Sequence, residues 1–131
     1  MGESRIRNAT KIEAYGIKFR SKLELYTYEQ FKKYNIRVKY EPVHLTLLPK
    51  FKYMGENIRA ITYCPDFVGL GFIVECKGFA NESFPLRFKL FKYCLKDKHN
   101  VKCYVVKNHK QVDEMIKELL SQGHGDKNTV L

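Results

Sequence analysis

The stretch from Tyr63 to Gly78 constrains the fold of this chain more than any other. Its pattern predicts a strand that ends at Asp66, a glycine-rich turn, and a returning strand from Phe72 to Lys77. Because alternate side chains of a strand share one face, Glu75 should project on the same side as Lys77. The stretch therefore predicts a hairpin that presents two carboxylates and an ammonium group together.

These three side chains suit phosphodiester hydrolysis. Asp66 and Glu75 offer the hard oxygen ligands that a divalent cation such as Mg²⁺ prefers. Lys77 can hold or steer the water that becomes the nucleophile. The motif is short, so the rest of the chain must supply the context for it.

The composition favours one folded domain with a polyanionic partner. At 131 residues the chain has room for a single core, and we assign residues 1–131 to one domain. The formal net charge of +10 indicates binding to nucleic acid. A solvated basic surface is the alternative, and charge alone does not decide between the two.

The cysteines show no pattern of a zinc site, because there is no Cys-x-x-Cys pair and no cluster of histidines. They lie in or beside apolar segments, which predicts free thiols in a reducing compartment. We find no stretch typical of a signal peptide or a transmembrane helix, and expect no membrane partner and a cytoplasmic location. The four are Cys64, Cys76, Cys94 and Cys103.

Periodicity and turn residues predict a mixed α/β order of helix, three strands, helix, strand and helix. Residues 1–12 are expected to form a flexible basic arm, and residues 122–131 a flexible tail. The expected helices are 22–34, a segment capped by Ser83 with Pro85 in its first turn, and 110–120, capped by Asn108 and ended by Gly123. The second carries an apolar stripe of Phe84, Phe88, Phe91 and Leu95, and the third an apolar face of Val112, Met115, Ile116, Leu119 and Leu120. The expected strands are 37–48 with an irregularity at Pro42, 59–64, 72–77 and 100–106, with a basic hairpin tip at 49–57.

Glu24 has two interpretations. It lies three residues after Ser21, so the two can form a capping box at the start of the first helix. It can also face the metal site as a further acidic residue, directly or through a water, and given the downstream Asp66 and Glu75 we place this role slightly ahead. Glu41 can flank the same site or be an exposed strand carboxylate.

Lysines follow one face of the helix that comes after the Glu-Xaa-Lys strand. Lysines at this spacing are also typical of a solvated helix face. Because the helix directly follows the Glu-Xaa-Lys strand, we favour contact of these lysines with phosphate. The candidate DNA-binding residues are Lys89, which we expect nearest the site, Lys92 and Lys96, together with Lys22 and Arg20.

Pro65-Asp66, Glu75-Xaa-Lys77 and the order of elements over residues 15–106 resemble the αβββαβ core of the PD-(D/E)XK, or restriction-endonuclease-like, nuclease superfamily. Within it, the segment 16–24 and the strands around the motif look most like a family of small phage and prophage proteins with a predicted nuclease fold. The arrangement is similar to that of phage Holliday-junction resolvases and of the end-cleaving subunits of some transposases. The chain departs from these relatives at Arg20, where they often carry Asp.

This resemblance implies an α/β fold with a four-stranded mixed sheet flanked by helices, and a site built from Glu24, Asp66, Glu75 and Lys77. Asp66, Glu75 and the main-chain carbonyl of Cys76 would be ligands of Mg²⁺, for which Mn²⁺ can substitute. The implied activity is that of a DNA endonuclease acting on branched or structured DNA in phage recombination or replication. A non-catalytic nucleic-acid-binding module on the same fold is the alternative. A homodimer would suit paired nicks in a four-way junction.

Overall fold

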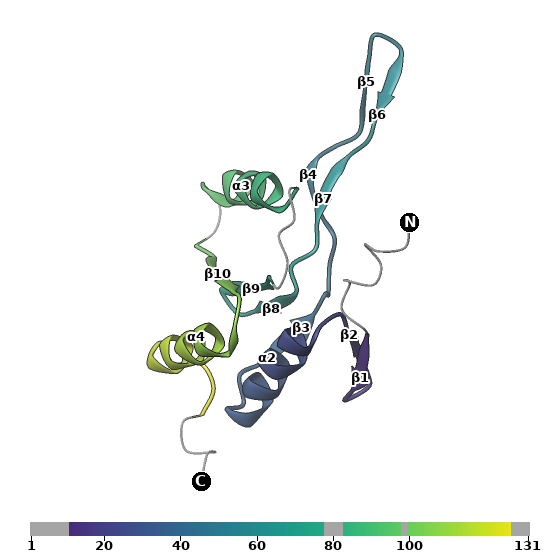
Figure 1. The fold of residues 1–131 in the computed structure, drawn as a ribbon. Helices are drawn as coiled ribbons and strands as arrows, with labels where there is room; N and C mark the ends of the chain where they lie inside the picture. The colour runs from purple at the N-terminus through teal and green to yellow at the C-terminus, as the bar shows by residue number, and fades with distance from the viewer. Residues whose placement is uncertain (1–10, 78–82, 98–99, 127–131) are drawn as a thin grey trace. The chain divides into compact units, whose positions relative to one another are not determined.

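The computed structural model of the protein describes residues 11–77, 83–97 and 100–126. Within these residues the fold is mixed α/β, with three helices and a four-stranded mixed sheet (Figure 1). The chain forms two compact units. The first unit comprises Met1–Arg37, Cys76–Gly78 and Val105–Leu131, and the second comprises Val38–Glu75 and Phe79–Tyr104.

The first unit contains a short hairpin and two helices. Strands β1 (Ile12–Ala14) and β2 (Ile17–Phe19) pair antiparallel. Their turn is a Tyr15-Gly16 pair with φ values of 57° and 75°, which is the backbone of the two-residue turns that suit hairpins. The predicted basic arm lies outside the described residues up to residue 10, and from Ile12 onward the chain is a strand.

The two helices of this unit begin and end close to where local signals predict. Helix α2 spans Lys22–Lys33 and helix α4 spans His109–Ser121. Asn108 caps α4 by accepting a hydrogen bond from the backbone amide of Gln111 at 2.9 Å. The two helices contact each other. The apolar face of α4 is buried as predicted, and comprises Val112, Met115, Ile116 and Leu119.

The described part of the predicted flexible tail makes backbone hydrogen bonds. Gly123 ends α4 with φ at 94°. Three residues later the amide of Asp126 donates to the carbonyl of Tyr34, just beyond the end of α2, at 2.7 Å. The flexibility of the tail stays a prediction, and residues 127–131 lie outside the described part of the chain.

The second unit is organised by the four-stranded sheet, whose order is β10-β9-β8-β3. The pairs β3–β8 and β8–β9 are antiparallel. The amide of Lys102 donates to the carbonyl of Gly71, and the amide of Lys77 donates to that of Val106, so β9 and β10 run in the same direction. The bounds are β3 Val38–Tyr40, β8 Phe67–Gly69, β9 Phe72–Cys76 and β10 Lys102–Val106.

The strand predicted over residues 37–48 is two strands. Glu41 has a φ of 44°, and the following Pro42 has no amide hydrogen to donate, so the ladder ends with the hydrogen bond of the Glu41 amide. The chain resumes as β4 (Leu45–Leu48), which pairs with β7 (Ile61–Tyr63) in a separate two-stranded ribbon. The expected irregularity at Pro42 is thus a change of sheet.

The structure has a further strand, β8, in the stretch that the sequence predicts to be a glycine-rich turn. The turn instead lies at Leu70-Gly71, and Gly69 pairs with Phe72 at the end of β8. A Cβ atom at position 69 would lie 2.2 Å from the ring of Phe72. Glycine is therefore required here by the close approach of an aromatic ring across the hairpin.

Helix α3 (Phe84–Leu95) covers a core in the second unit. Its predicted apolar stripe packs against Tyr63 and Ile73, with Phe91 only 3% exposed. Pro85 lies in the first turn as predicted, but the expected Ser83 cap is wrong. Ser83 has helical dihedrals and its hydroxyl accepts a hydrogen bond from Arg87, so it does not cap a backbone amide.

The last predicted strand is buried on both of its faces. Cys103 packs with the α3 core, while Tyr104 on the alternate face is 8% exposed. The strand begins at Lys102, two residues later than predicted.

None of the helices in the described residues has the length and hydropathy needed to cross a bilayer.

The predicted basic hairpin tip is a ribbon of two strands, β5 (Phe51–Tyr53) and β6 (Glu56–Ile58). Its turn at Met54-Gly55 has φ values of 48° and 83°, again the geometry of a tight hairpin. In Figure 1 this ribbon continues from β4 and β7 and leads away from α3.

Candidate functional site

Asp66 lies at the bend between β7 and β8 and is 7% exposed. Its main-chain carbonyl accepts a hydrogen bond from the amide of Glu41 at 2.8 Å, which continues the β3–β8 ladder by one residue. Phe67 pairs with Val74 in the β8–β9 ladder, so the next position in that register sets Asp66 opposite Glu75. The two motif carboxylates therefore come from neighbouring strands at the same end of the sheet.

A tyrosine hydroxyl is hydrogen-bonded to Glu75. The hydroxyl of Tyr63 donates to Oε1 of Glu75 at 2.7 Å, and the tyrosine is 5% exposed. Burial is the main cause of a raised pKa for Tyr63, and the charges of Glu75 and Asp66 raise it further. The structure therefore brings the Tyr63 hydroxyl to Glu75, at the end of the sheet where Asp66 also lies.

Tyr63 is the site residue that sequence reasoning missed. It lies three positions before Asp66, and its ring belongs to the α3 core, with a centroid 5.1 Å from that of Phe91. In the sequence, the place of Tyr63 at the end of an apolar strand is fully explained by core packing of its ring. Its hydroxyl reaches Glu75 only because the chain bends after β7, and no local pattern marks that contact.

Glu24 lies in the first unit and forms the predicted cap. Its amide donates to Oγ of Ser21 at 3.1 Å, and its own Oε1 accepts from the amide of Arg20 at 2.8 Å. The side chain is 4% exposed. This is a capping box in which the glutamate returns to the residue before the cap. The capping interpretation is confirmed, and the metal-site interpretation stays a prediction.

The end of β9 also belongs to the first unit. Sγ of Cys76 donates to Oγ1 of Thr27 at 3.5 Å, and the amide of Lys77 donates to the carbonyl of Val106 at 2.9 Å. Thr27 lies three residues after Glu24 in α2, so both face the same side of that helix. Within this unit the end of β9 therefore contacts the helix face that carries Glu24, and Lys77 follows Glu75 by two positions.

The two motif carboxylates offer hard oxygen donors. Asp66, Glu75 and the main-chain carbonyls of β9 fit the ligand preference of Mg²⁺. In the described part of the chain, no group of three or more His, Cys, Asp or Glu side chains is arranged to hold a metal ion. The donor set thus fits a cation that keeps several waters.

The predicted DNA-binding lysines of α3 are exposed, as a phosphate-binding surface requires. Two of them also make local contacts. The ammonium of Lys92 lies 4.5 Å from the ring centroid of Phe88, and Lys96 forms an ion pair with Asp97. Lys89 is exposed on the same helix, while Arg20 and Lys22 are exposed at the start of α2 in the first unit.

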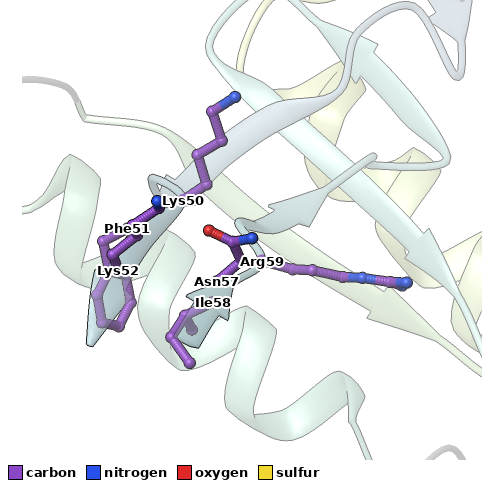
Figure 2. A pocket seen from close by; sticks show the side chains of 6 residues that line it. All are labelled: Lys50, Phe51, Lys52, Asn57, Ile58 and Arg59. Carbon is purple, nitrogen blue, oxygen red and sulfur yellow. The ribbon is translucent and has the colours of Figure 1, made fainter. Parts of the chain in front are cut away.

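A groove of about 470 Å³ lies elsewhere in the second unit, on the β5–β6 ribbon (Figure 2). Three cationic side chains line it together with an aromatic ring. Figure 2 shows the ring of Phe51 and the side chain of Ile58 extending to one side, with Lys50 and Arg59 extending away from them. The lining residues are Lys50, Phe51, Lys52, Asn57, Ile58 and Arg59.

The four cysteines are free thiols, as predicted, and all are half-buried. Burial raises the pKa of the Cys103 thiol.

Comparison with known proteins identifies a family. The model of a family described as "Protein of unknown function (DUF1064)" matches residues 4–113. The chain belongs to this family. The DUF1064 match runs from the N-terminal segment into α4 and includes Tyr63, Asp66 and Glu75. No curated protein and no solved structure matches the chain significantly. The description of the DUF1064 family states no activity, so the function is argued from the site.

Proposed function

We propose that the protein is a metal-dependent DNA endonuclease with a restriction-endonuclease-like core, acting on branched or structured DNA. The observation that carries this proposal is that Asp66 and Glu75 lie opposite each other at one end of the sheet, with Glu75 hydrogen-bonded to the buried hydroxyl of Tyr63. Lys77 follows on the same strand at the spacing of the nuclease motif. Asp66 is nearly buried and Glu75 half-buried, and carboxylates withdrawn from solvent in this way are typical of catalytic sites.

The order of elements supports the same assignment. Helix α2 precedes three antiparallel strands of the sheet, β3, β8 and β9, and α3 then connects β9 to the parallel strand β10. With β4 to β7 counted as an insertion between β3 and β8, this order agrees with the αβββαβ core that we propose. The net charge of +10 agrees with a nucleic-acid substrate.

In this proposal each residue has a chemical role. Asp66, Glu75 and the main-chain carbonyl of Cys76 would hold Mg²⁺ or Mn²⁺, which supplies positive charge to the scissile phosphate. Tyr63 fixes the orientation of the Glu75 carboxylate through its hydrogen bond. Lys77 donates hydrogen bonds to the attacking water, and the exposed Lys89 contacts a neighbouring phosphate.

The direct test is cleavage of DNA in Mg²⁺ by the purified protein and by an Asp66→Asn variant. We expect the wild type to cut and the variant to lose at least about 100-fold in rate, because the charge that binds the cation is removed. DNA binding should persist in the variant. Unchanged cleavage by Asp66→Asn would refute the assignment. DNA binding without cleavage by the wild type, in Mg²⁺ and in Mn²⁺, would favour the non-catalytic binding module.

The same assay on Glu24→Gln separates the two roles of Glu24. The amide oxygen of Gln can still accept from the Arg20 amide, so the cap and the stability should be retained. A loss of about tenfold or more in cleavage with an unchanged urea midpoint would place the Glu24 charge in the site. Full activity would restrict Glu24 to capping.

The substrate is defined by comparing a four-way junction, a fork, a linear duplex and a single strand in one assay. We expect the junction or the fork to be cut fastest. Sedimentation of the protein with the junction would show whether two copies act together, as paired nicks in a four-way junction require.

A further inference from the structure

The β4–β7 and β5–β6 ladders form one continuous ribbon. Phe51 pairs with Ile58. Three residues farther from the Met54-Gly55 turn on each strand, Leu48 pairs with Ile61, so both ladders keep the same register across Pro49. The register shifts once, between Thr46 and Leu48. We call residues 48–61 the arm. Leu45 and Leu47, just before the arm, pack against the α3 core, whereas the arm itself is largely exposed.

The arm has two chemically different faces. Lys52 pairs with Asn57, and the same alternation places Lys50 and Arg59 on this side of the ribbon. We call these four residues the cationic face. The opposite side carries Phe51 and Ile58, then Tyr53 and Glu56. Glu56 is the one acidic residue of the arm, against three cationic ones.

The tip exposes large apolar side chains. Phe51 is 45% exposed, Tyr53 62% and Met54 88%. Side chains of this size cost free energy in water, so a cluster of them on a projecting hairpin indicates a binding surface. We call Tyr53 and Met54, next to the Met54-Gly55 turn, the apolar tip.

DNA is the partner that fits both features. A cationic face needs a polyanion, and exposed aromatic rings stack on nucleobases whatever their sequence. A two-stranded ribbon also has the width to enter a major groove. An apolar protein partner would leave the three cationic side chains of the arm without opposite charges. An arm exposed only to water would not require the large apolar side chains at its tip.

We propose that the arm is a DNA-binding element, in which the cationic face contacts the sugar-phosphate backbone and the apolar tip stacks on bases left unpaired at a branch. The inference rests on the proposed function for its choice of branched DNA. It adds a means of selecting that substrate, located on the inserted ribbon and separate from the carboxylates that would cut.

The cationic face is tested by the binding of a fluorescent four-way junction and a linear duplex, followed by anisotropy without divalent cations so that no cleavage occurs. We expect the triple variant Lys50→Ala, Lys52→Ala, Arg59→Ala to bind both DNAs about tenfold more weakly. The slope of log Kd against log salt should fall by about two to three, close to one per lost phosphate contact.

A matched control removes three exposed lysines of the first unit, in the variant Lys107→Ala, Lys110→Ala, Lys117→Ala. This variant should bind within about twofold of the wild type and keep most of its salt slope. An equal loss in both triple variants would mean that only net charge matters and would overturn the proposal. Urea midpoints of all variants show whether the core is intact.

The apolar tip is tested by the double variant Tyr53→Ala, Met54→Ala. We expect it to bind the junction about fivefold more weakly while its affinity for the linear duplex is unchanged, since the duplex offers few unstacked bases. The control is Leu70→Ala, Tyr93→Ala, two exposed apolar residues of the same unit, which should bind both DNAs normally. Equal losses on junction and duplex would contradict stacking at a branch.

Two outcomes separate this inference from the proposed function. Arm-dependent binding of the junction by a protein that never cuts DNA would support the arm and refute the nuclease. Cleavage that is insensitive to both arm variants would do the reverse. If the tip variant changes the oligomeric state in sedimentation but not DNA binding, the tip contacts a second copy of the chain and the proposal is wrong.

Discussion

The two units each contain a hydrogen bond from a tyrosine hydroxyl to a carboxylate, and the two bonds are nearly the same length. In the second unit Tyr63 donates to Glu75 at 2.7 Å, and in the first unit Tyr26 donates to Asp113 at 2.6 Å. Both bonds raise the pKa of the tyrosine. Distance alone would give them the same importance.

Their surroundings differ. Burial is the largest cause of the raised pKa of Tyr63, whereas the hydrogen bond to Asp113 is the largest cause for Tyr26. Tyr26 bridges α2 and α4, and its ring stacks on His109 with centroids 3.7 Å apart. The same chemical pair therefore positions a carboxylate in one unit and joins two helices in the other.

The largest effect that separates the two bonds should come from Tyr63→Phe. Removing the hydroxyl leaves Glu75 without the donor that orients it, so we expect cleavage at limiting Mg²⁺ to fall about 10- to 100-fold. The unfolding free energy should fall by about 1.5–3 kcal/mol, as for hydrogen bonds to charged groups. Cleavage rates over a Mg²⁺ titration and urea denaturation measure the two effects. A wild-type titration curve in this variant would remove Tyr63 from the site.

Tyr26→Phe is the matched control and should show a smaller effect of another kind. Its bond is at the surface, so its loss should cost about 0.5–1.5 kcal/mol in urea denaturation. Cleavage should be unchanged, because the bond joins two helices of the first unit. A tenfold loss of cleavage in Tyr26→Phe would break the contrast between the two tyrosines.

The smallest effect is a pH dependence of the Tyr26 bond. Its pKa rises from 10.0 to about 12 in the folded protein, because the neutral phenol is the donor to Asp113. The bond thus stabilises fully below pH 10, the unfolded value, and is lost as the pH rises through about 12. The difference in unfolding free energy between wild type and Tyr26→Phe should shrink over this interval. A constant difference would mean that the hydroxyl does not contribute.

The sequence predicted the elements whose signals are local. Ser21 and Asn108 begin helices because a side-chain oxygen accepts from an amide three residues on, and Gly123 ends one because it adopts a positive φ. Ser83 has the same side chain, but its backbone is already helical. The conformation of a cap residue depends on the chain before it, which the residue type does not report.

The strand divisions depend on contacts made across the sheet. Gly69 belongs to β8 because the ring of Phe72 occupies the space of its absent side chain, and the sequence around it is equally typical of a turn. That Asp66 lies opposite Glu75 follows from the hairpin register, which the turn sets. The role of Tyr63 does not, because its hydroxyl acts beyond the bend that follows β7.

The continuous register of the arm makes its length adjustable. Because the pairs Phe51–Ile58 and Leu48–Ile61 keep the same register, removing or adding two residues on each strand would preserve which side chains share a face. Neither change would touch the pairing of β3, β8 and β9. The reach of this hairpin can therefore be lengthened or shortened in whole steps while the end of the sheet that carries Asp66 and Glu75 stays as it is.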